Sequence, residues 1–510
     1  MKKKTIILAI ILIIAIASIC VIKNKKSKYD YDLTKVTSYE YFTLISNEKH
    51  GVINKNGDII IKPNYTDIII PNPEKDMFFC YSNDTVEVIN SKGEKLYTNF
   101  EKVEPIKLKN VATTLNYEKS VFKFQKDGKY GLINTNGKVI VKNEYESIEN
   151  LQLCEGLFLV EQNSKYGIIN LKGTVVITPS YDNIISDGYY TEKDGYKKSG
   201  FIVSNKTDDG YRYGYITNTG KTYLSTSYNS VARVWKNDTD KDVYLVASQG
   251  GKYGLYKNKK NTISEEYQSI EFDENNHLLI IEKNKKYGAA SLEGKIIIEP
   301  ENTELEIKGI YIYAKQSLEN KVYDLDGNKI NISFNKAIYE TENENYRIAT
   351  LENNDVTYYG IVEKNGNTLV NEKYQYIEYA FGTYFIAKND EGNFGIISSN
   401  GKEAVEFKYN VLQKLKGKNV LQAVNSASGV TDFYSSSLKT ILSVKNADIN
   451  NEEEYIKIST EKETIYLDAD GNKISENSDI VKNSIKLQEP DTIGKYKKVQ
   501  FTLENVYYVE

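Results

Sequence analysis

Short runs of alternating hydrophobic and polar residues recur along most of the chain. β-Branched and aromatic residues occupy runs of four to seven positions, and Asn, Asp and Gly separate one run from the next. Such runs are typical of β-strands joined by tight turns, whereas helices place apolar residues three or four positions apart. In one stretch we expect strands at 157–161, 166–170 and 174–177 and a short strand near Ile184. The pattern therefore predicts an all-β protein.

These runs belong to an internal repeat. An aromatic residue precedes a Gly, a second Gly stands six residues after the first, and a Tyr usually follows fourteen residues after the first, as in Tyr166-Gly167, Gly173 and Tyr181. Weaker copies keep mainly the turn, at Gly93, Gly327 and Gly471. Twelve units of about 38 residues cover the chain. The first glycines of the clearest copies are Gly51, Gly131, Gly167, Gly214, Gly288, Gly360 and Gly395.

The two glycines of each unit are expected to have different roles. The second closes a tight hairpin, where a positive φ favours Gly. The first lies inside a strand, where Gly weakens pairing unless another backbone or a ring approaches closely. The neighbouring aromatic residue and the later Tyr are the expected covers. In the segment from Tyr166 to Ile169 both strand faces carry apolar side chains, so each sheet should be covered on both sides.

The motif resembles that of the WG-repeat family, bacterial proteins built from tandem aromatic-Gly units. Tyr, His or Phe stands here where the family name has Trp, and Trp235 lies outside the motif. The resemblance implies an extracytoplasmic or interaction module, without an activity common to the family.

Units of this length hold three or four strands and match the blade of a β-propeller. Twelve units exceed the usual four to eight blades of one propeller. We therefore predict two propellers of about six blades each, at residues 29–280 and 281–510. An open β-superhelix, or solenoid, is the alternative, because it needs no closure and tolerates irregular spacing.

The first 28 residues differ from the rest of the chain. Residues 5–22 are uncharged, and lysines flank them on both sides. This run meets the minimum length for one transmembrane helix. We expect residues 1–28 to be an uncleaved signal anchor in the cell membrane, with an extracytoplasmic body. A cleaved signal peptide with Ala15 and Ala17 at its cleavage site is the alternative.

Charge and cysteine content exclude some functions. The formal net charge is −4, and because residues 1–28 carry seven Lys and no acidic residue, the body is acidic. Nucleic-acid binding needs a basic footprint, so no nucleic-acid partner is expected. Cys80 and Cys154 have no CxxC spacing and are expected to be packed thiols, although a disulfide between them stays open.

Candidate chemical motifs are few. The segments that begin at Asp324 and Asp468 resemble the start of a calcium loop, but they occupy the turn position of the repeat and are expected to be hairpin turns. His50 replaces a motif Tyr and should be a packed ring, whereas His277 lies in a polar loop. Neither a metal or cofactor ligand set nor a nucleophile motif is recognisable, so we expect no enzyme, no cofactor and no metal.

We therefore expect a non-catalytic binding or scaffolding module for a protein or cell-envelope ligand. A cell-envelope hydrolase that uses a carboxylate pair and a purely structural spacer are the alternatives. The 43 Tyr are the main compositional hint, since Tyr rings can anchor a ligand. Candidate binding clusters are Tyr189 and Tyr190 with Tyr196, Tyr374 with Tyr376 and Tyr379, and Tyr507 with Tyr508.

Overall fold

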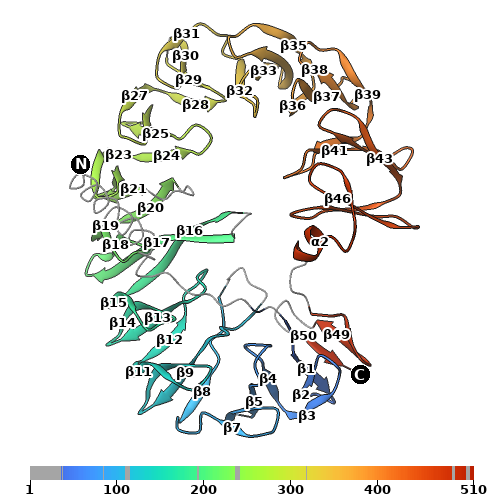
Figure 1. Ribbon diagram of the computed structural model, residues 1–510. Helices are drawn as coiled ribbons and strands as arrows, with labels where there is room; N and C mark the ends of the chain where they lie inside the picture. The colour runs from blue at the N-terminus through green and yellow to red at the C-terminus, as the bar shows by residue number, and fades with distance from the viewer. Residues whose placement is uncertain are drawn as a thin grey trace, which may run out of the picture. The chain divides into compact units, whose positions relative to one another are not determined.

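The computed structural model confirms an all-β chain (Figure 1). It describes residues 36, 38–83, 85–109, 115–191, 195–235, 242–317, 319–484, 489–500 and 506–509. Strands dominate these residues, and α2 (Asp479–Ser484) is a short helix near the C-terminus. The expected anchor at residues 1–28 lies outside the described residues. Within the part that is described, no helix has the length and apolar character needed to cross a membrane.

The chain forms two compact units. Unit 1 extends to Glu266 and also takes in the chain from Leu487 onward, and unit 2 extends from Tyr267 to Lys486. The division expected near residue 280 falls inside a strand of unit 2, β25 (Leu278–Lys283). The sequence motif and the start of a sheet do not coincide. The aromatic-Gly motif lies on the third strand of a sheet, so each sheet begins two strands before its motif.

The described strands of unit 1 form one sheet that joins the two ends of the described chain, and five sheets of four strands each. They are β1 (Tyr41–Ser46), β2 (Lys49–Asn54), β3 (Ile59–Tyr65), β48 (Thr492–Ile493), β49 (Tyr496–Gln500) and β50 (Val506–Val509); β4 (Asp67–Ile69), β5 (Phe78–Ser82), β6 (Thr85–Ile89) and β7 (Lys95–Leu96); β8 (Lys102–Glu104), β9 (Val121–Lys126), β10 (Lys129–Asn134) and β11 (Val139–Tyr145); β12 (Ser147–Asn150), β13 (Leu157–Gln162), β14 (Lys165–Asn170) and β15 (Val175–Tyr181); β16 (Asn183–Thr191), β17 (Gly195–Thr207), β18 (Gly210–Thr217) and β19 (Thr222–Tyr228); and β20 (Ser230–Trp235), β21 (Tyr244–Gln249), β22 (Lys252–Lys257) and β23 (Lys260–Tyr267).

Unit 2 contains six sheets of four strands in its described residues. They are β24 (Ser269–Asp273), β25, β26 (Lys286–Ser291) and β27 (Ile296–Asn302); β28 (Glu304–Lys308), β29 (Tyr311–Lys315), β30 (Asn320–Asp324) and β31 (Lys329–Ile330); β32 (Lys336–Glu340), β33 (Tyr346–Asn353), β34 (Val356–Glu363) and β35 (Thr368–Tyr374); β36 (Tyr376–Phe381), β37 (Tyr384–Lys388), β38 (Phe394–Ser398) and β39 (Glu403–Tyr409); β40 (Val411–Lys414), β41 (Val420–Asn425), β42 (Val430–Ser435) and β43 (Thr440–Lys445); and β44 (Asp448–Asn451), β45 (Ile456–Ser459), β46 (Thr464–Leu467) and β47 (Lys473–Ile474).

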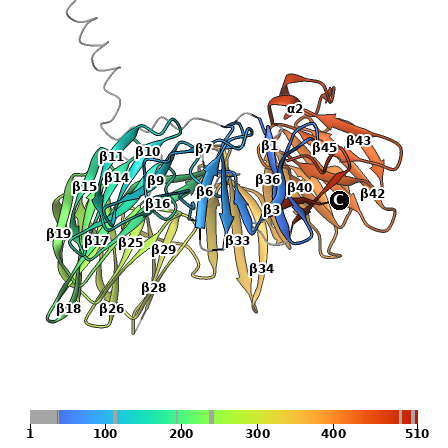
Figure 2. The same ribbon diagram turned by 90° about the horizontal axis from the view of Figure 1, so that it is seen from below.

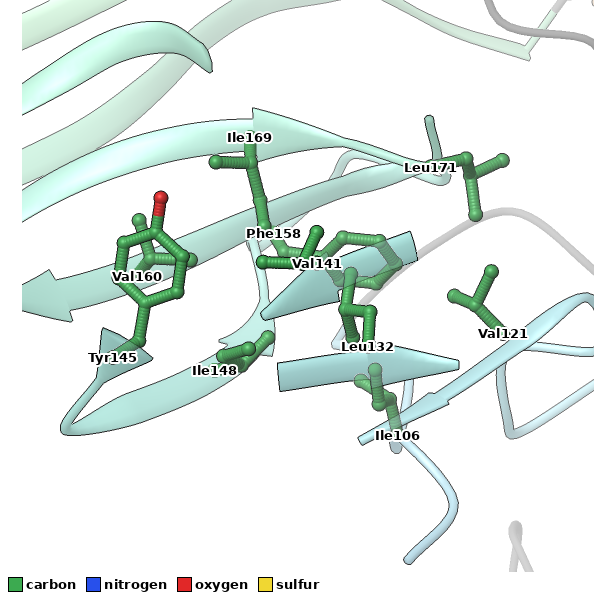
Figure 3. Close-up of a cluster of buried hydrophobic side chains, with 10 residues drawn as sticks. All are labelled: Ile106, Val121, Leu132, Val141, Tyr145, Ile148, Phe158, Val160, Ile169 and Leu171. Carbon is green, nitrogen blue, oxygen red and sulfur yellow. The ribbon is translucent and has the colours of Figure 1, made fainter. Parts of the chain in front are cut away.

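Every four-stranded sheet is an antiparallel meander, in which the strands pair in chain order. Within unit 1 the strands of successive sheets lie alongside one another (Figure 2). Apolar side chains fill the space between successive sheets, as the expected cover on both faces requires. Figure 3 shows the junction between the β8–β11 and β12–β15 sheets. Its buried residues are Ile106, Val121, Leu132, Val141, Tyr145, Ile148, Phe158, Val160, Ile169 and Leu171.

The two ends of the described chain meet in one sheet of unit 1, with the strand order β3-β2-β1-β50-β49-β48. β1 and β50 pair in parallel, with Leu44 opposite Tyr508. The Tyr508 ring is fully buried, and its centroid lies 5.1 Å from that of Phe42. The C-terminal residues lack the aromatic-Gly motif, so the repeat pattern alone does not predict this pairing.

The first Gly of each unit is required by the backbone of the fourth strand. A Cβ placed on Gly167 would lie 2.5 Å from the carbonyl oxygen of Ile177, where the register of β14 and β15 shifts in a bulge. The expected ring cover is wrong in its partners, because the ring that approaches is Phe124 at Gly131 and Phe407 at Gly395. The motif aromatic instead pairs with the later Tyr across the strands, as Tyr166 does with Tyr181. The corresponding carbonyl lies within 3 Å of such a Cβ at Gly51, Gly131, Gly214, Gly254, Gly288, Gly360 and Gly395.

The second Gly closes the hairpin, as predicted. Gly173 has a φ of +74°, and its N–H donates to the carbonyl of Asn170. The Asn170 side-chain oxygen accepts hydrogen bonds from the N–H groups of Lys172 and Thr174, both at 2.9 Å. An Asn or Asp at this position therefore holds the turn that Gly completes.

In the described part of the chain, the later Tyr of the motif makes a hydrogen bond to the next sheet at Tyr65, Tyr228 and Tyr409. The Tyr65 hydroxyl donates to Glu87 at 3.0 Å, and the Tyr409 hydroxyl donates to Asp432 at 2.7 Å. Tyr228 donates to the hydroxyl of Tyr256 at 3.0 Å. Each partner lies in the following sheet. The Tyr ring therefore packs between two sheets, and its hydroxyl makes a hydrogen bond from one sheet to the next.

Candidate functional site

The two calcium-like segments are hairpin turns, as expected. Asp324 accepts hydrogen bonds from the N–H groups of Asp326 and Asn328, at 3.0 and 2.8 Å. Burial alone would raise the pKa of Asp324, but these donors and the Asn328 side chain outweigh it, so the pKa is lowered. Asp468 has the same contacts with Asp470 and Asn472. These carboxylates therefore serve the turns of the repeat.

The two His occupy the expected environments. His50 lies in β2, nearly buried, and its Nδ1 is 2.9 Å from the Asp67 carboxylate. Its ring meets Tyr507 edge-on, with centroids 5.0 Å apart. His277 lies in the connection between β24 and β25, near the Phe272 ring. The structure thus does not bring the two His to a common site, since they belong to different sheets.

The cysteines are packed thiols. Cys80 and Cys154 are buried and belong to different hydrophobic clusters, so they do not pair with each other. Burial raises the pKa of Cys80 to about 12, so its thiol stays protonated at neutral pH. Among the described residues, no three His, Cys, Asp or Glu side chains gather as a metal site would need.

The expected Tyr clusters separate into structural rings and one group beside a cavity. Tyr508 is buried, and its hydroxyl donates to the carbonyl of Pro490 at 2.6 Å. The backbone of Tyr190 pairs with that of Tyr196 between β16 and β17. Tyr374 stacks on Phe407 of the following sheet, with centroids 6.0 Å apart.

Tyr376 and Tyr379 lie on β36, next to the β32–β35 sheet. The Tyr376 ring lies 5.9 Å from that of Tyr359, and its hydroxyl donates to Glu378 at 2.8 Å. Burial and this hydrogen bond raise the pKa of Tyr376 to about 12. Tyr359 lines a cavity, whereas Tyr376 and Tyr379 do not. The Tyr cluster expected from the sequence therefore lies next to a candidate site but is not part of its lining.

This cavity has a volume of about 440 Å³ and lies within unit 2, beside one face of the β32–β35 sheet. Lys308 at the end of β28 and Ile377 of β36 complete its wall, so three successive sheets contribute to it. Small-molecule sites commonly have volumes of roughly 300 to 1,000 Å³. The lining residues are Lys308, Phe334, Asn335, Lys336, Ala337, Tyr339, Ile348, Thr350, Glu352, Thr357, Tyr359 and Ile377.

Strand register explains why these residues share a face. Thr350 of β33 lies opposite Ala337 on one side and Tyr359 on the other. Tyr339 and Ile348 form the next row, because side chains two positions apart point to the same side of a strand. Ala337 and Thr350 are short, so they leave unfilled space beside the larger rings.

Three aromatic rings border the space. Tyr339 is 39% exposed, although burial of its remainder raises its pKa. Tyr359 packs against Tyr376, and Phe334 packs against Tyr313 with ring centroids 5.4 Å apart. The cavity thus combines one ring open to solvent with two rings held by their neighbours.

The charges around the cavity are balanced. Lys336 Nζ lies 2.5 Å from Glu372, and Lys308 Nζ lies 3.1 Å from Glu306. Glu352 is the carboxylate among the lining residues. Its main chain is fixed by two 2.8 Å hydrogen bonds with Asn335, one in each direction. The wall therefore offers both donors and acceptors without a concentrated charge of one sign.

A second, shallower groove of about 510 Å³ runs along β46 and β47. Glu463 and Glu476 line it, and both are exposed. The Tyr466 hydroxyl donates to Glu476 at 3.3 Å. A glycosidase acid needs a raised pKa, which burial in an apolar pocket supplies, so two exposed carboxylates are poorly suited to that chemistry.

The lining of the cavity could be predicted only in part. Tyr359 is recognisable as the aromatic residue of a repeat unit, and Tyr376 belongs to an expected cluster. Tyr339 stands alone in the sequence, and Ala337 and Thr350 are inconspicuous there. A register alignment of the sheets would have revealed the short side chains opposite Tyr359.

Comparison with known proteins supports the repeat. The family described as WG containing repeat matches residues 51–75, 130–166 and 166–191, so the chain contains WG repeats at these regions. No curated protein matches the chain.

Similar solved structures share little sequence with the chain. The computationally designed Ika8 protein is 13% identical over 53% of this chain and 92% of its own, with a TM-score of 0.22. A eukaryotic initiation factor is 10% identical over 70% and 94%, with a TM-score of 0.27. The extracellular domain of a putative hybrid two component system from B. thetaiotaomicron is 8% identical over 84% and 69%, with a TM-score of 0.17. At these TM-scores the similarities say nothing about function.

Proposed function

We propose that this WG-repeat chain is a membrane-anchored, extracytoplasmic and non-catalytic module that binds a cell-envelope component in the cavity beside the β32–β35 sheet. The observation that carries the proposal is the cavity itself, which combines aromatic rings with charge-balanced polar groups. Convergent polar groups in a largely preformed pocket are typical of ligand sites. A purely structural spacer gives no reason for such an opening, whereas the junction between the β8–β11 and β12–β15 sheets is filled.

A binding role fits the chemistry of the lining better than catalysis does. Hydrolysis of a glycosidic bond uses two carboxyl groups that face each other across the substrate. The lining of the cavity supplies Glu352 alone, and the Glu463 and Glu476 groove leaves its carboxylates exposed. We therefore rank an envelope hydrolase second.

Co-sedimentation of the purified full chain with isolated cell-wall and membrane fractions tests the proposal. We expect saturable binding that Tyr339→Ala abolishes and Tyr211→Ala leaves unchanged. Tyr211 is a matched control because it is 48% exposed and lies on β18 in unit 1. No binding to any fraction, or equal binding by both variants, would contradict the proposal. Degradation of a fraction that Glu463→Gln prevents would favour the hydrolase instead.

A further inference from the structure

The size of the cavity limits its occupant to a small molecule or to one residue or a few residues of a polymer. Its 440 Å³ volume is in the range of small-molecule sites. A protein partner commonly covers roughly 800 Å² of each surface, much more than twelve lining side chains around one opening provide. The occupant must therefore enter the cavity rather than lie across a broad face.

The balanced charges favour an uncharged occupant. Both lysines of the wall already face a carboxylate, Lys336 with Glu372 and Lys308 with Glu306. A phosphate or carboxylate ligand would have to compete with these carboxylates, and Glu352 would repel it. A cationic ligand would meet the two ammonium groups. A neutral ligand avoids both costs.

The remaining groups of the wall match a polyol. Thr357 can donate and accept hydrogen bonds, and Asn335 keeps a second amide hydrogen beside the one that it gives to the Glu352 carbonyl. Thr350, whose hydroxyl donates to the Ala337 carbonyl, can accept them, as can the Glu352 carboxylate. Tyr339 presents a partly exposed ring beside them. A pyranose has an apolar C–H face and a rim of hydroxyl groups, so it can place the face on a ring and the rim against polar groups.

We propose that the ligand of this cavity is a neutral saccharide, with one sugar ring packed on Tyr339 and its hydroxyl groups bound by Thr350, Thr357, Asn335 and Glu352. This inference rests on the proposed function and specifies its ligand. It assigns Tyr339 as the main binding residue, since Tyr359 and Phe334 are held by neighbouring rings.

Titration calorimetry of the full chain with soluble trisaccharides tests the inference. The neutral probes are chitotriose, cellotriose and maltotriose, and trigalacturonate is the anionic probe. We expect one or more neutral probes to bind at one site, and trigalacturonate to bind at least about tenfold more weakly. Tyr339→Ala should weaken binding roughly tenfold, whereas Tyr339→Phe should retain it, because the ring supplies most of the contact.

The controls separate failure of this inference from failure of the proposed function. Tyr211→Ala should bind the probes as the wild type does, and an unchanged denaturation midpoint should show that Tyr339→Ala folds. If no neutral probe binds while envelope sedimentation still depends on Tyr339, the saccharide assignment is wrong and the proposed function stands. If trigalacturonate binds more tightly than the neutral probes, the assignment of a neutral ligand is wrong. If envelope binding is indifferent to Tyr339, both are wrong.

Discussion

The β8–β11 and β32–β35 sheets have the same repeat backbone, yet they differ in the face that carries the aromatic residue of the motif. In the β8–β11 sheet, Tyr130 lies in one row with Gln125 and Lys102, which both have long side chains. In the β32–β35 sheet, Tyr359 lies in the equivalent row with Thr350 and Ala337. The first face is closed over a filled junction (Figure 3), and the second opens into the cavity.

This difference separates the parts of the repeat that build the fold from those that are free to vary. The glycines and the fourth-strand bulge are the same in both sheets, and a Cβ placed on Gly131 or Gly360 would lie 2.4 Å from a facing carbonyl oxygen. The two sheets differ in the side chains on their first two strands. A repeat protein can therefore keep one backbone and form a ligand site by shortening two side chains.

The largest effect is expected at the filled junction. Phe158 is fully buried between the β8–β11 and β12–β15 sheets. Phe158→Ala should lower the free energy of unfolding of unit 1 by about 3 to 5 kcal/mol, because the lost contacts leave a cavity. Denaturant unfolding followed by hydrogen exchange of the β13 and β14 amides measures this. A loss below about 1 kcal/mol would show that this junction is looser than its packing indicates.

Enlarging a side chain should distinguish the two sheets with a smaller effect. Val160→Leu adds volume to a site that is already filled and should destabilise unit 1 by about 1 to 3 kcal/mol. Ala337→Val should destabilise unit 2 by less, about 1 kcal/mol at most, because Ala337 is buried against Tyr313 and Val322 but also borders the open space of the cavity. Denaturation midpoints of the two variants provide the comparison. Equal losses would mean that the cavity closes in solution.

A pH effect is expected at the filled junction. Glu118, which is 1% exposed and precedes β9, has a raised pKa because of burial, to which Glu155 adds. The native state therefore holds this proton above pH 4.5, where the unfolded chain loses it, so stability should fall as pH rises from there to the raised value. Glu118→Gln should flatten that part of the profile. An unchanged slope in thermal unfolding across this range would contradict the assignment.

Much of the fold could be predicted from the sequence, because the repeat records backbone requirements directly. Gly173 and Asn170 specify a turn, and Gly167 specifies a close approach of another strand, so sheets and hairpins follow from local chemistry. The residue at which each sheet begins and the pairing of β1 with β50 could not be predicted, because both depend on contacts between segments that are distant in the sequence. Tyr339 escaped prediction for the same reason. A single exposed ring becomes a candidate only when the register places Ala337 and Thr350 beside it.

The central claim is that two short side chains create the ligand site. The Ala337→Lys and Thr350→Gln double variant reproduces the row formed by Lys102 and Gln125 in the β8–β11 sheet. Co-sedimentation with the envelope fraction that binds the wild type, together with a denaturation midpoint, measures the outcome directly. We predict that the double variant still folds, with a lowered midpoint because both positions are buried, and no longer binds. Binding equal to that of the wild type would contradict the claim.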